Sequence, residues 1–171
     1  MANITFNGQP ANTIGNMPLA GSIAPDFTGI QNNLSPLNLH SLKGKNIVMN
    51  IFPSLDTPVC ACSVRQFNIA AADLPNTVVL CLSKDLPFAQ SRFCVAEGIT
   101  NLITLSLYLD PSFDEKYGML ITDGPLRGLF ARGIIVINTE MQITYTELVS
   151  EITNEPNYQA AVAAVGKQAF D

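Results

Sequence analysis

Cys60 stands where an apolar segment gives way to a predicted helix, and its neighbours make it the strongest candidate for a reactive group. Residues 53–60 read Pro-Ser-Leu-Asp-Thr-Pro-Val-Cys. Asp56 or Thr57 can cap the helix, and Pro58 suits its first turn. With Thr57 as the cap, Cys60 becomes the third helical residue.

This position favours a thiolate at Cys60, because the first turn of a helix has unpaired N–H groups and about half a positive charge. The thiolate is the attacking form of cysteine. Most free cysteines are instead small, buried apolar residues. The order of strand, proline, capping threonine and cysteine favours the reactive interpretation, and we expect Cys60 to be a nucleophile.

The spacing Pro53-x-x-x-Thr57-x-x-Cys60 resembles the active-site motif of the peroxiredoxins. Residues 50–60 are similar to one branch of that family, the bacterial thiol peroxidases. So are the segments Asp-Leu-Pro-Phe-Ala-Gln-Ser-Arg-Phe-Cys at 85–94 and Asp-Gly-Pro-Leu-Arg-Gly-Leu at 123–129, which extend the similarity along nearly the whole chain. The resemblance implies a thioredoxin-like fold and a thiol-dependent peroxidase that reduces hydrogen peroxide and organic hydroperoxides.

The resemblance also implies roles for three further residues. Thr57 would donate its hydroxyl to the sulfur or to the bound peroxide, besides serving as a helix cap. Pro53 would shield the sulfur and shape the pocket. Arg132 precedes a predicted central strand and corresponds to the arginine that the family places beside the reactive sulfur. The residues alone do not separate it from the other candidate arginines, which are Arg65, Arg92 and Arg127.

Recycling of an oxidised Cys60 requires a second thiol. Positions i and i+2 of a helix point to different sides, so a bridge to Cys62 is geometrically poor. Cys81 lies inside a predicted apolar strand and is expected to be buried and inert. Cys94 remains, and the family's resolving cysteine aligns there.

We therefore expect an intramolecular disulfide between Cys60 and Cys94. Its formation needs the two Cα atoms within about 7 Å, and thiols that start farther apart require local unwinding of both helix ends. The resemblance implies a thioredoxin-type reductant. Cys62 departs from the family pattern, and it is interpreted either as a bystander or as a secondary redox site.

Two other functions remain open. A thiol–disulfide oxidoreductase of the thioredoxin type needs Cys-x-x-Cys at the helix start, whereas Cys60 and Cys62 are separated by one residue. A non-enzymatic redox sensor or chaperone that merely becomes oxidised is compatible with the same sequence.

Composition bounds the remaining possibilities. With 171 residues, 47% hydrophobic content and a mean hydropathy of +0.24, we expect one domain spanning 1–171. The charged fraction of 13% is low, which favours a covered sheet or an association surface, and we expect a homodimer. A net charge of −5 without basic runs argues against nucleic acid.

No apolar run approaches the length of about 18 residues that a membrane helix needs, and residues 1–7 lack the features of a signal peptide. We therefore expect no membrane association and a cytoplasmic location. The spacing of the four cysteines lacks the paired ligands of zinc sites, and His40 is the only histidine. No metal or cofactor is expected.

The elements that would position Cys60 follow from the apolar pattern. An N-terminal hairpin is predicted within 1–16, with its turn at Asn7-Gly8. Buried strands at 46–52 and 77–83, separated by a helix at 59–72, form a βαβ unit that gathers functional groups at the carboxyl ends of its strands.

The remaining predicted elements are short strands at 26–30 and 37–39, a helix from 86 or 87 to 97 stopped by Gly98, a strand at 102–107, a helical turn at 112–117, an antiparallel hairpin of 134–138 and 142–149, a helix at 157–165, and a frayed tail at 166–171. This order is typical of a thioredoxin-like α/β fold, with a central mixed sheet flanked by helices and an added N-terminal β-hairpin.

Overall fold

The computed structural model describes residues 2–166, which form β-strands, four α-helices and one short 3-10 helix. The strands are β1 (Asn3–Phe6), β2 (Gln9–Asn12), β3 (Thr28–Ile30), β4 (Pro36–Asn38), β5 (Asn46–Ile51), β6 (Thr77–Ser83), β7 (Ile103–Ser106), β8 (Gly133–Ile137) and β9 (Ile143–Leu148). The helices are η1 (Leu39–Leu42), α1 (Pro58–Ala71), α2 (Pro87–Glu97), α3 (Pro111–Tyr117) and α4 (Tyr158–Ala164).

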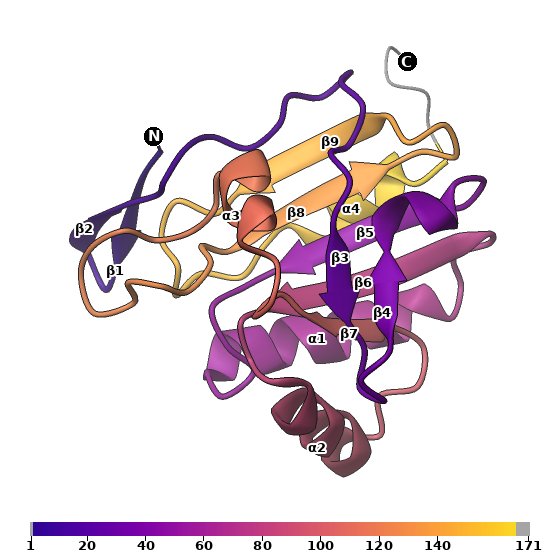
Figure 1. Ribbon diagram of the computed structural model, residues 1–171, viewed down its shortest axis with the longest axis horizontal. Helices are drawn as coiled ribbons and strands as arrows, with labels where there is room; N and C mark the ends of the chain where they lie inside the picture. The colour runs from indigo at the N-terminus through magenta and orange to yellow at the C-terminus, as the bar shows by residue number, and fades with distance from the viewer. Residues whose placement is uncertain (1, 167–171) are drawn as a thin grey trace.

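Seven strands form one mixed sheet in the order β4-β3-β7-β6-β5-β8-β9, while β1 and β2 form a separate hairpin at one end of the molecule (Figure 1). At the centre, β5 runs parallel to β6 and antiparallel to β8. The helix α1 connects β5 to β6, so the predicted βαβ unit is confirmed. The first strand of this unit, β5, ends shortly before the segment that carries Cys60.

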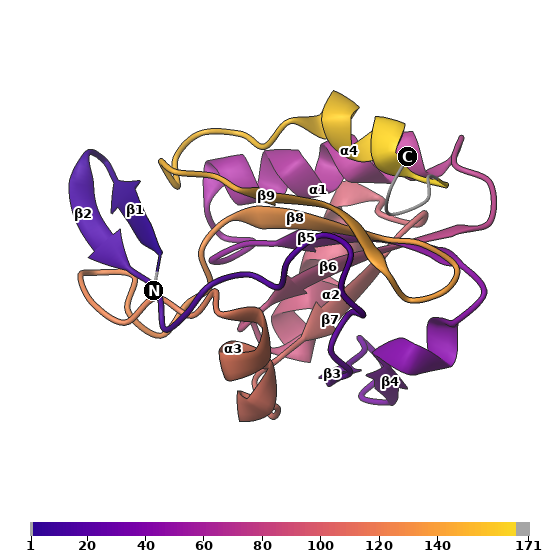
Figure 2. The ribbon, with the colours of Figure 1, turned by 90° about the horizontal axis from the view of Figure 1, so that it is seen from above.

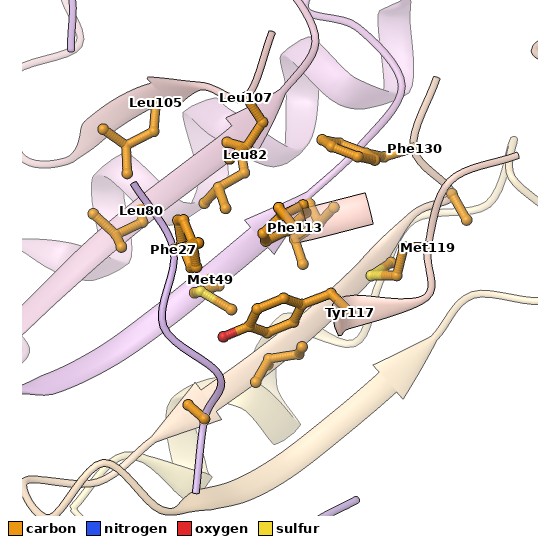
Figure 3. Packing of buried hydrophobic residues seen from close by; sticks show 14 of the residues in the cluster. Phe27, Met49, Leu80, Leu82, Leu105, Leu107, Phe113, Tyr117, Met119 and Phe130 are labelled. Carbon is orange, nitrogen blue, oxygen red and sulfur yellow. The ribbon is translucent and has the colours of Figure 1, made fainter. Parts of the chain in front are cut away.

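The alternation of side chains along β5 divides the core into two layers. Ile47, Met49 and Ile51 belong to the larger cluster, which also holds Phe113 and Tyr117 of α3 (Figure 3). On the opposite face, a smaller cluster contains buried side chains of α1, α4 and the central strands, namely Val48, Phe67, Val79, Ile134, Val136, Ala161 and Ala164. Figure 2 shows α1 and α4 on one side of the sheet and α3 on the other, so both faces are covered.

The predicted central mixed sheet, its flanking helices and the N-terminal hairpin are confirmed, with element ends shifted by one or two residues. The last helix begins at Tyr158 because Asn157 acts as its cap, accepting a hydrogen bond from the Ala160 N–H at 3.0 Å. In the N-terminal turn, Asn7 and Gly8 have φ of 51° and 78°, as the hairpin turn requires. Of the predicted frayed tail, residues 167–171 lie outside the described residues, and a single domain over 1–171 remains our proposal.

Candidate active site

Cys60 is the third residue of α1, in the first turn of the helix that follows the carboxyl end of β5. Thr57 occupies the N-cap position and Pro58 the first helical position, as predicted. The side chain of Cys60 is fully buried. Its sulfur accepts a hydrogen bond from Nη2 of Arg132 at 3.1 Å.

Arg132 lies directly before β8 and is only 1% exposed. Its Nε donates to the backbone carbonyl of Ile152 at 2.8 Å. Nη1 is buried and has no hydrogen-bond partner within residues 2–166, and no carboxylate of that range forms an ion pair with the guanidinium. Arg132 therefore places a positive charge in direct contact with the buried Cys60 sulfur.

Thr57 and Pro53 lie at the same site, but the Thr57 hydroxyl is turned away from the predicted partner. It donates to the backbone carbonyl of Ser54 at 2.9 Å and makes neither a side-chain cap for α1 nor a hydrogen bond to the Cys60 sulfur. The hydroxyl oxygen can still accept a hydrogen bond, because it uses only its proton in the contact with Ser54.

A pocket of about 200 Å³ lies over this group, with Arg132 and Thr57 in its wall. The other lining residues are mostly apolar and come from the N-terminal hairpin, the start of α1 and the segments before β8 and α4, namely Phe6, Pro53, Pro58, Val59, Leu126, Ile152 and Thr153. Arg132, Thr57 and Pro53 therefore line one cavity, and the buried Cys60 lies behind its wall, in contact with Arg132.

Cys94 lies near the C-terminal end of α2. Its sulfur is 3.8 Å from the hydroxyl oxygen of Thr104 and lines a separate pocket of about 250 Å³ together with Asn32. Both Cys60 and Cys94 contact one apolar cluster between α1, α2 and the sheet, which also contains Phe52, Leu55, Val64, Cys81 and Ile99. Neither cysteine is in a disulfide, and Cys60 is buried whereas Cys94 lines a pocket.

Cys81 lies in β6 and is fully buried. Burial raises the pKa of its thiol to about 12. The Asn50 amide donates to its sulfur at 3.7 Å and to the Ser63 hydroxyl at 3.1 Å, and Ser63 donates to the carbonyl of Cys60 at 2.8 Å. Cys81 is thus protonated at neutral pH and part of the wall that supports the first turn of α1.

Cys62 does not line the pocket beside Arg132 but lines an adjoining one together with Glu155. Its thiol donates to the carboxylate of Glu155 at 3.0 Å, and this contact raises the pKa of Cys62 above its ordinary value. The same carboxylate accepts a hydrogen bond from Tyr158 at 3.1 Å, and the pKa of Glu155 is lowered, chiefly by the bond from Cys62. This environment favours the neutral thiol at Cys62, in contrast to the cationic environment of Cys60.

Two parts of the site were not found from the sequence. The polar pair of Asn50 and Ser63 could have been noticed, because Asn50 interrupts an otherwise apolar strand. The carbonyl of Ile152 gives no sequence signal, because every residue carries the same backbone group. It contributes through its position, by fixing the guanidinium of Arg132.

The segment that holds Ile152 is fastened to the N-terminal hairpin by Glu151. The carboxylate of Glu151 accepts hydrogen bonds from the N–H of Thr153 at 2.8 Å, the N–H of Gly8 at 2.7 Å and the hydroxyl of Thr5 at 3.0 Å. These contacts, the Thr153 N–H first among them, lower the pKa of Glu151 to about 2. The hairpin and the segment that supports Arg132 are therefore joined by the Glu151 carboxylate in addition to the backbone hydrogen bonds between Thr5 and residues 150 and 152.

We expect acid to weaken this junction. The folded pKa lies below the unfolded one, so the stabilisation is complete above about pH 4.5 and is lost as the pH falls toward about 2. Glu151→Gln should lower the urea midpoint near neutral pH, and the gap to the parent protein should close near pH 2. A gap that stays constant over this range would contradict the role of the ionised carboxylate.

Within residues 2–166, no three His, Cys, Asp or Glu side chains are grouped as ligands of a metal ion. None of the helices in this range is both long enough and apolar enough to cross a membrane.

Comparisons with known proteins identify the family of the chain. The model of the Redoxin family matches residues 19–162. The chain is 52% identical over 166 residues to a thiol peroxidase of Mycobacterium tuberculosis, covering 97% of this chain and 99% of that protein. The similarity to this relative extends over nearly the full length of both chains.

Solved structures share the same architecture. A peroxiredoxin-like protein from Aquifex aeolicus superposes with a TM-score of 0.90 at 35% identity, covering 95% of each chain. A thiol peroxidase from Chromobacterium violaceum superposes with a TM-score of 0.86 at 21% identity, covering 94% of this chain and 93% of that one. The predicted thioredoxin-like fold of the peroxiredoxins is confirmed. The chain therefore belongs to the Redoxin family and is a thiol-dependent peroxidase of the peroxiredoxin type.

Proposed function

We propose that Cys60 is the nucleophile of this peroxidase and that Arg132 and Thr57 assist it. The observation that carries the proposal is the 3.1 Å contact between Arg132 Nη2 and the Cys60 sulfur in a buried environment. The thiolate attacks one oxygen of a hydroperoxide, the O–O bond breaks, and Cys60 becomes a sulfenic acid. The leaving oxygen carries the electron pair and takes a proton to become water or an alcohol.

Donors near the leaving oxygen lower the barrier of this step. Arg132 supplies one, since its Nη1 has no partner within the described residues and Arg132 lines the pocket. The hydroxyl of Thr57 supplies a second polar contact in the same wall, after rotation from the Ser54 carbonyl. Pro53 lines the same pocket as Arg132 and Thr57, which supports its proposed role in shaping the pocket.

The pocket supports organic hydroperoxides as substrates besides hydrogen peroxide. Phe6, Leu126 and Ile152 line it together with the proline rings, so an alkyl group would replace water against apolar side chains. The polar side chains that line the pocket are those of Arg132, Thr57 and Thr153. This arrangement suits a substrate with one peroxide group and an apolar remainder.

Cys94 is the proposed resolving cysteine. Its thiol attacks the Cys60 sulfenic acid, forms the disulfide and releases water, and a thioredoxin-type dithiol then reduces the disulfide. The Cys94 sulfur lines the pocket beside Thr104 rather than the one beside Arg132. Because Cys60 and Cys94 lie on different helices and Cys94 lines a different pocket from Arg132, we propose that the first turn of α1 and the last turn of α2 unwind locally when the disulfide forms.

The geometry gives the rival interpretations no support. Cys62 donates to Glu155, away from Arg132, so Cys60 and Cys62 do not form the paired thiols of a disulfide oxidoreductase. A homodimer and a cytoplasmic location remain proposals. The exposed apolar side chains Phe88 and Leu109, at 66% and 62%, support an association surface.

The recycling step is tested by peptide mapping after addition of one equivalent of peroxide. We expect mass spectrometry to show a link between Cys60 and Cys94 within one chain as the dominant product. The variants Cys62→Ser and Cys81→Ser should retain that link. A dominant bridge from Cys60 to Cys62 or Cys81, or a link between two chains, would refute the assignment of Cys94.

A further inference from the structure

The carboxylate of Asp85 connects the Cys60 segment to the end of the central sheet. Asp85 is partly buried and lies two residues after β6. One oxygen accepts a hydrogen bond from the Ser54 hydroxyl at 2.7 Å. The other accepts from the Leu55 N–H at 2.8 Å and from the Ser83 hydroxyl at 2.7 Å. Hydrogen bonds to an ionised acceptor are stronger than neutral ones, so this side chain restrains the loop between β5 and α1.

The hydrogen bonds around Asp85 form a cluster, and buried groups fix the side of this cluster that faces the sheet. The Ser106 hydroxyl, at the end of β7, donates to the backbone carbonyl of Asp85 at 2.6 Å. The Gln90 amide donates to the Ser83 hydroxyl at 3.2 Å and to the Leu105 carbonyl at 3.0 Å. Ser83, Gln90 and Ser106 are all fully buried. The carboxylate is therefore held by the rigid centre of the fold.

On the side of the loop between β5 and α1, hydrogen bonds connect the cluster to the first turn of α1. The Ser54 carbonyl accepts both the N–H of Thr57 at 3.2 Å and the hydroxyl of Thr57 at 2.9 Å. The Thr57 carbonyl in turn accepts the N–H of Ala61 at 3.0 Å, in the first turn of α1. Cys60 lies in that turn, so its position relative to Arg132 depends on where Ser54 is held.

We propose that Asp85 is a positioning residue for the peroxide reaction. Its carboxylate fixes Ser54 and Leu55 and thereby holds Thr57 and Cys60 in register with Arg132. This rests on the proposed role of Cys60 as the nucleophile. Because a displacement of about 1 Å can cost roughly a hundredfold in rate, loss of the carboxylate slows sulfenic acid formation. It does not slow disulfide closure, which requires the turn to leave this arrangement.

The test separates the two half-reactions in single-turnover experiments on the full chain. Sulfenic acid formation at Cys60 and closure to the disulfide are followed by rapid quench and mass spectrometry. Asp85→Ala should lower the second-order rate of Cys60 oxidation by about 10- to 100-fold and leave the closure rate unchanged or faster. Asp85→Asn should recover most of the oxidation rate, because its amide oxygen can accept the Leu55 N–H while its NH₂ group donates to the Ser54 hydroxyl oxygen.

Asp110→Ala is the matched control. Asp110 also accepts several hydrogen bonds, from the Thr28 N–H at 3.1 Å and from the N–H of Ser112 at 3.1 Å, but it caps α3 on the other face of the sheet. It should lower the urea midpoint without changing Cys60 oxidation. Should Asp85→Ala fail to fold, Ser54→Ala removes one of the three contacts and should slow oxidation by a few-fold.

Three results would overturn the proposal. They are an unchanged oxidation rate in the folded Asp85 or Ser54 variant, equal slowing in Asp110→Ala, and no recovery in Asp85→Asn. Absence of a sulfenic acid at Cys60 in the parent protein would instead overturn the proposed function. The two failures are therefore distinguishable.

Discussion

Cys60→Ser is expected to abolish reductant-dependent peroxide consumption, with a loss on the order of a thousandfold or more. A serine hydroxyl in this position is neither ionised by Arg132 nor able to accept an oxygen atom from a peroxide and return it as water. The side chain is fully buried and similar in size, so the fold should be retained. The measurement is the rate of peroxide loss in the presence of a thioredoxin-type dithiol.

Cys62→Ser is the matched control for this prediction. It makes the same chemical change two residues later on α1, at a thiol that contacts Glu155 rather than Arg132. It should leave peroxide consumption within a few-fold of the parent rate. If Cys60→Ser retains rapid turnover, or if only Cys62→Ser loses it, the assignment of Cys60 as the nucleophile is wrong. Slow stoichiometric oxidation without turnover in the parent protein would favour the sensor interpretation.

Arg132→Met should lower the second-order rate of Cys60 oxidation by about 100- to 1000-fold, the typical cost of removing one donor to a developing negative charge. The substitution keeps an apolar stem in the cavity but removes the guanidinium that contacts the sulfur at 3.1 Å. The Ile152 carbonyl also loses its charged partner. We expect a second signature, slower alkylation of Cys60 by iodoacetamide at neutral pH, because the thiolate loses its counter-charge.

Arg65→Met provides the comparison. Arg65 also lies near the site in sequence, but its side chain is 44% exposed and forms an ion pair with Glu97 at 3.5 Å. Its loss should change neither the oxidation rate nor the alkylation rate. Equal rates in Arg132→Met and the parent protein would remove Arg132 from the mechanism, provided that a urea titration shows that the variant is folded.

The sequence predicted the location of Cys60 because local signals agreed there. An apolar run, a proline and a cap position specify a strand, its end and a helix start without reference to the rest of the chain. Arg132 was harder to identify, because four arginines compete and only the resemblance separated them. What distinguishes it physically is burial directly before β8, which depends on how β8 pairs with β5.

The orientation of side chains within the site was less predictable than the presence of the site. The Thr57 hydroxyl was expected at the sulfur or the substrate, yet it donates to the Ser54 carbonyl, a competing acceptor that the loop places nearby. Likewise, Glu155 is 93 residues from its partner Cys62 in sequence. Such contacts follow from the assembled fold and not from local spacing.

The separate pockets beside Arg132 and Cys94 have a kinetic consequence. In the proposed mechanism the peroxide binds beside Arg132, whereas the donor acts on the disulfide that contains Cys94, so the two reactants do not compete for one opening. Because one reactant oxidises the protein and the other reduces it in a separate step, initial-rate plots at several fixed donor concentrations should be parallel lines, and separate openings should prevent competitive substrate inhibition at high donor.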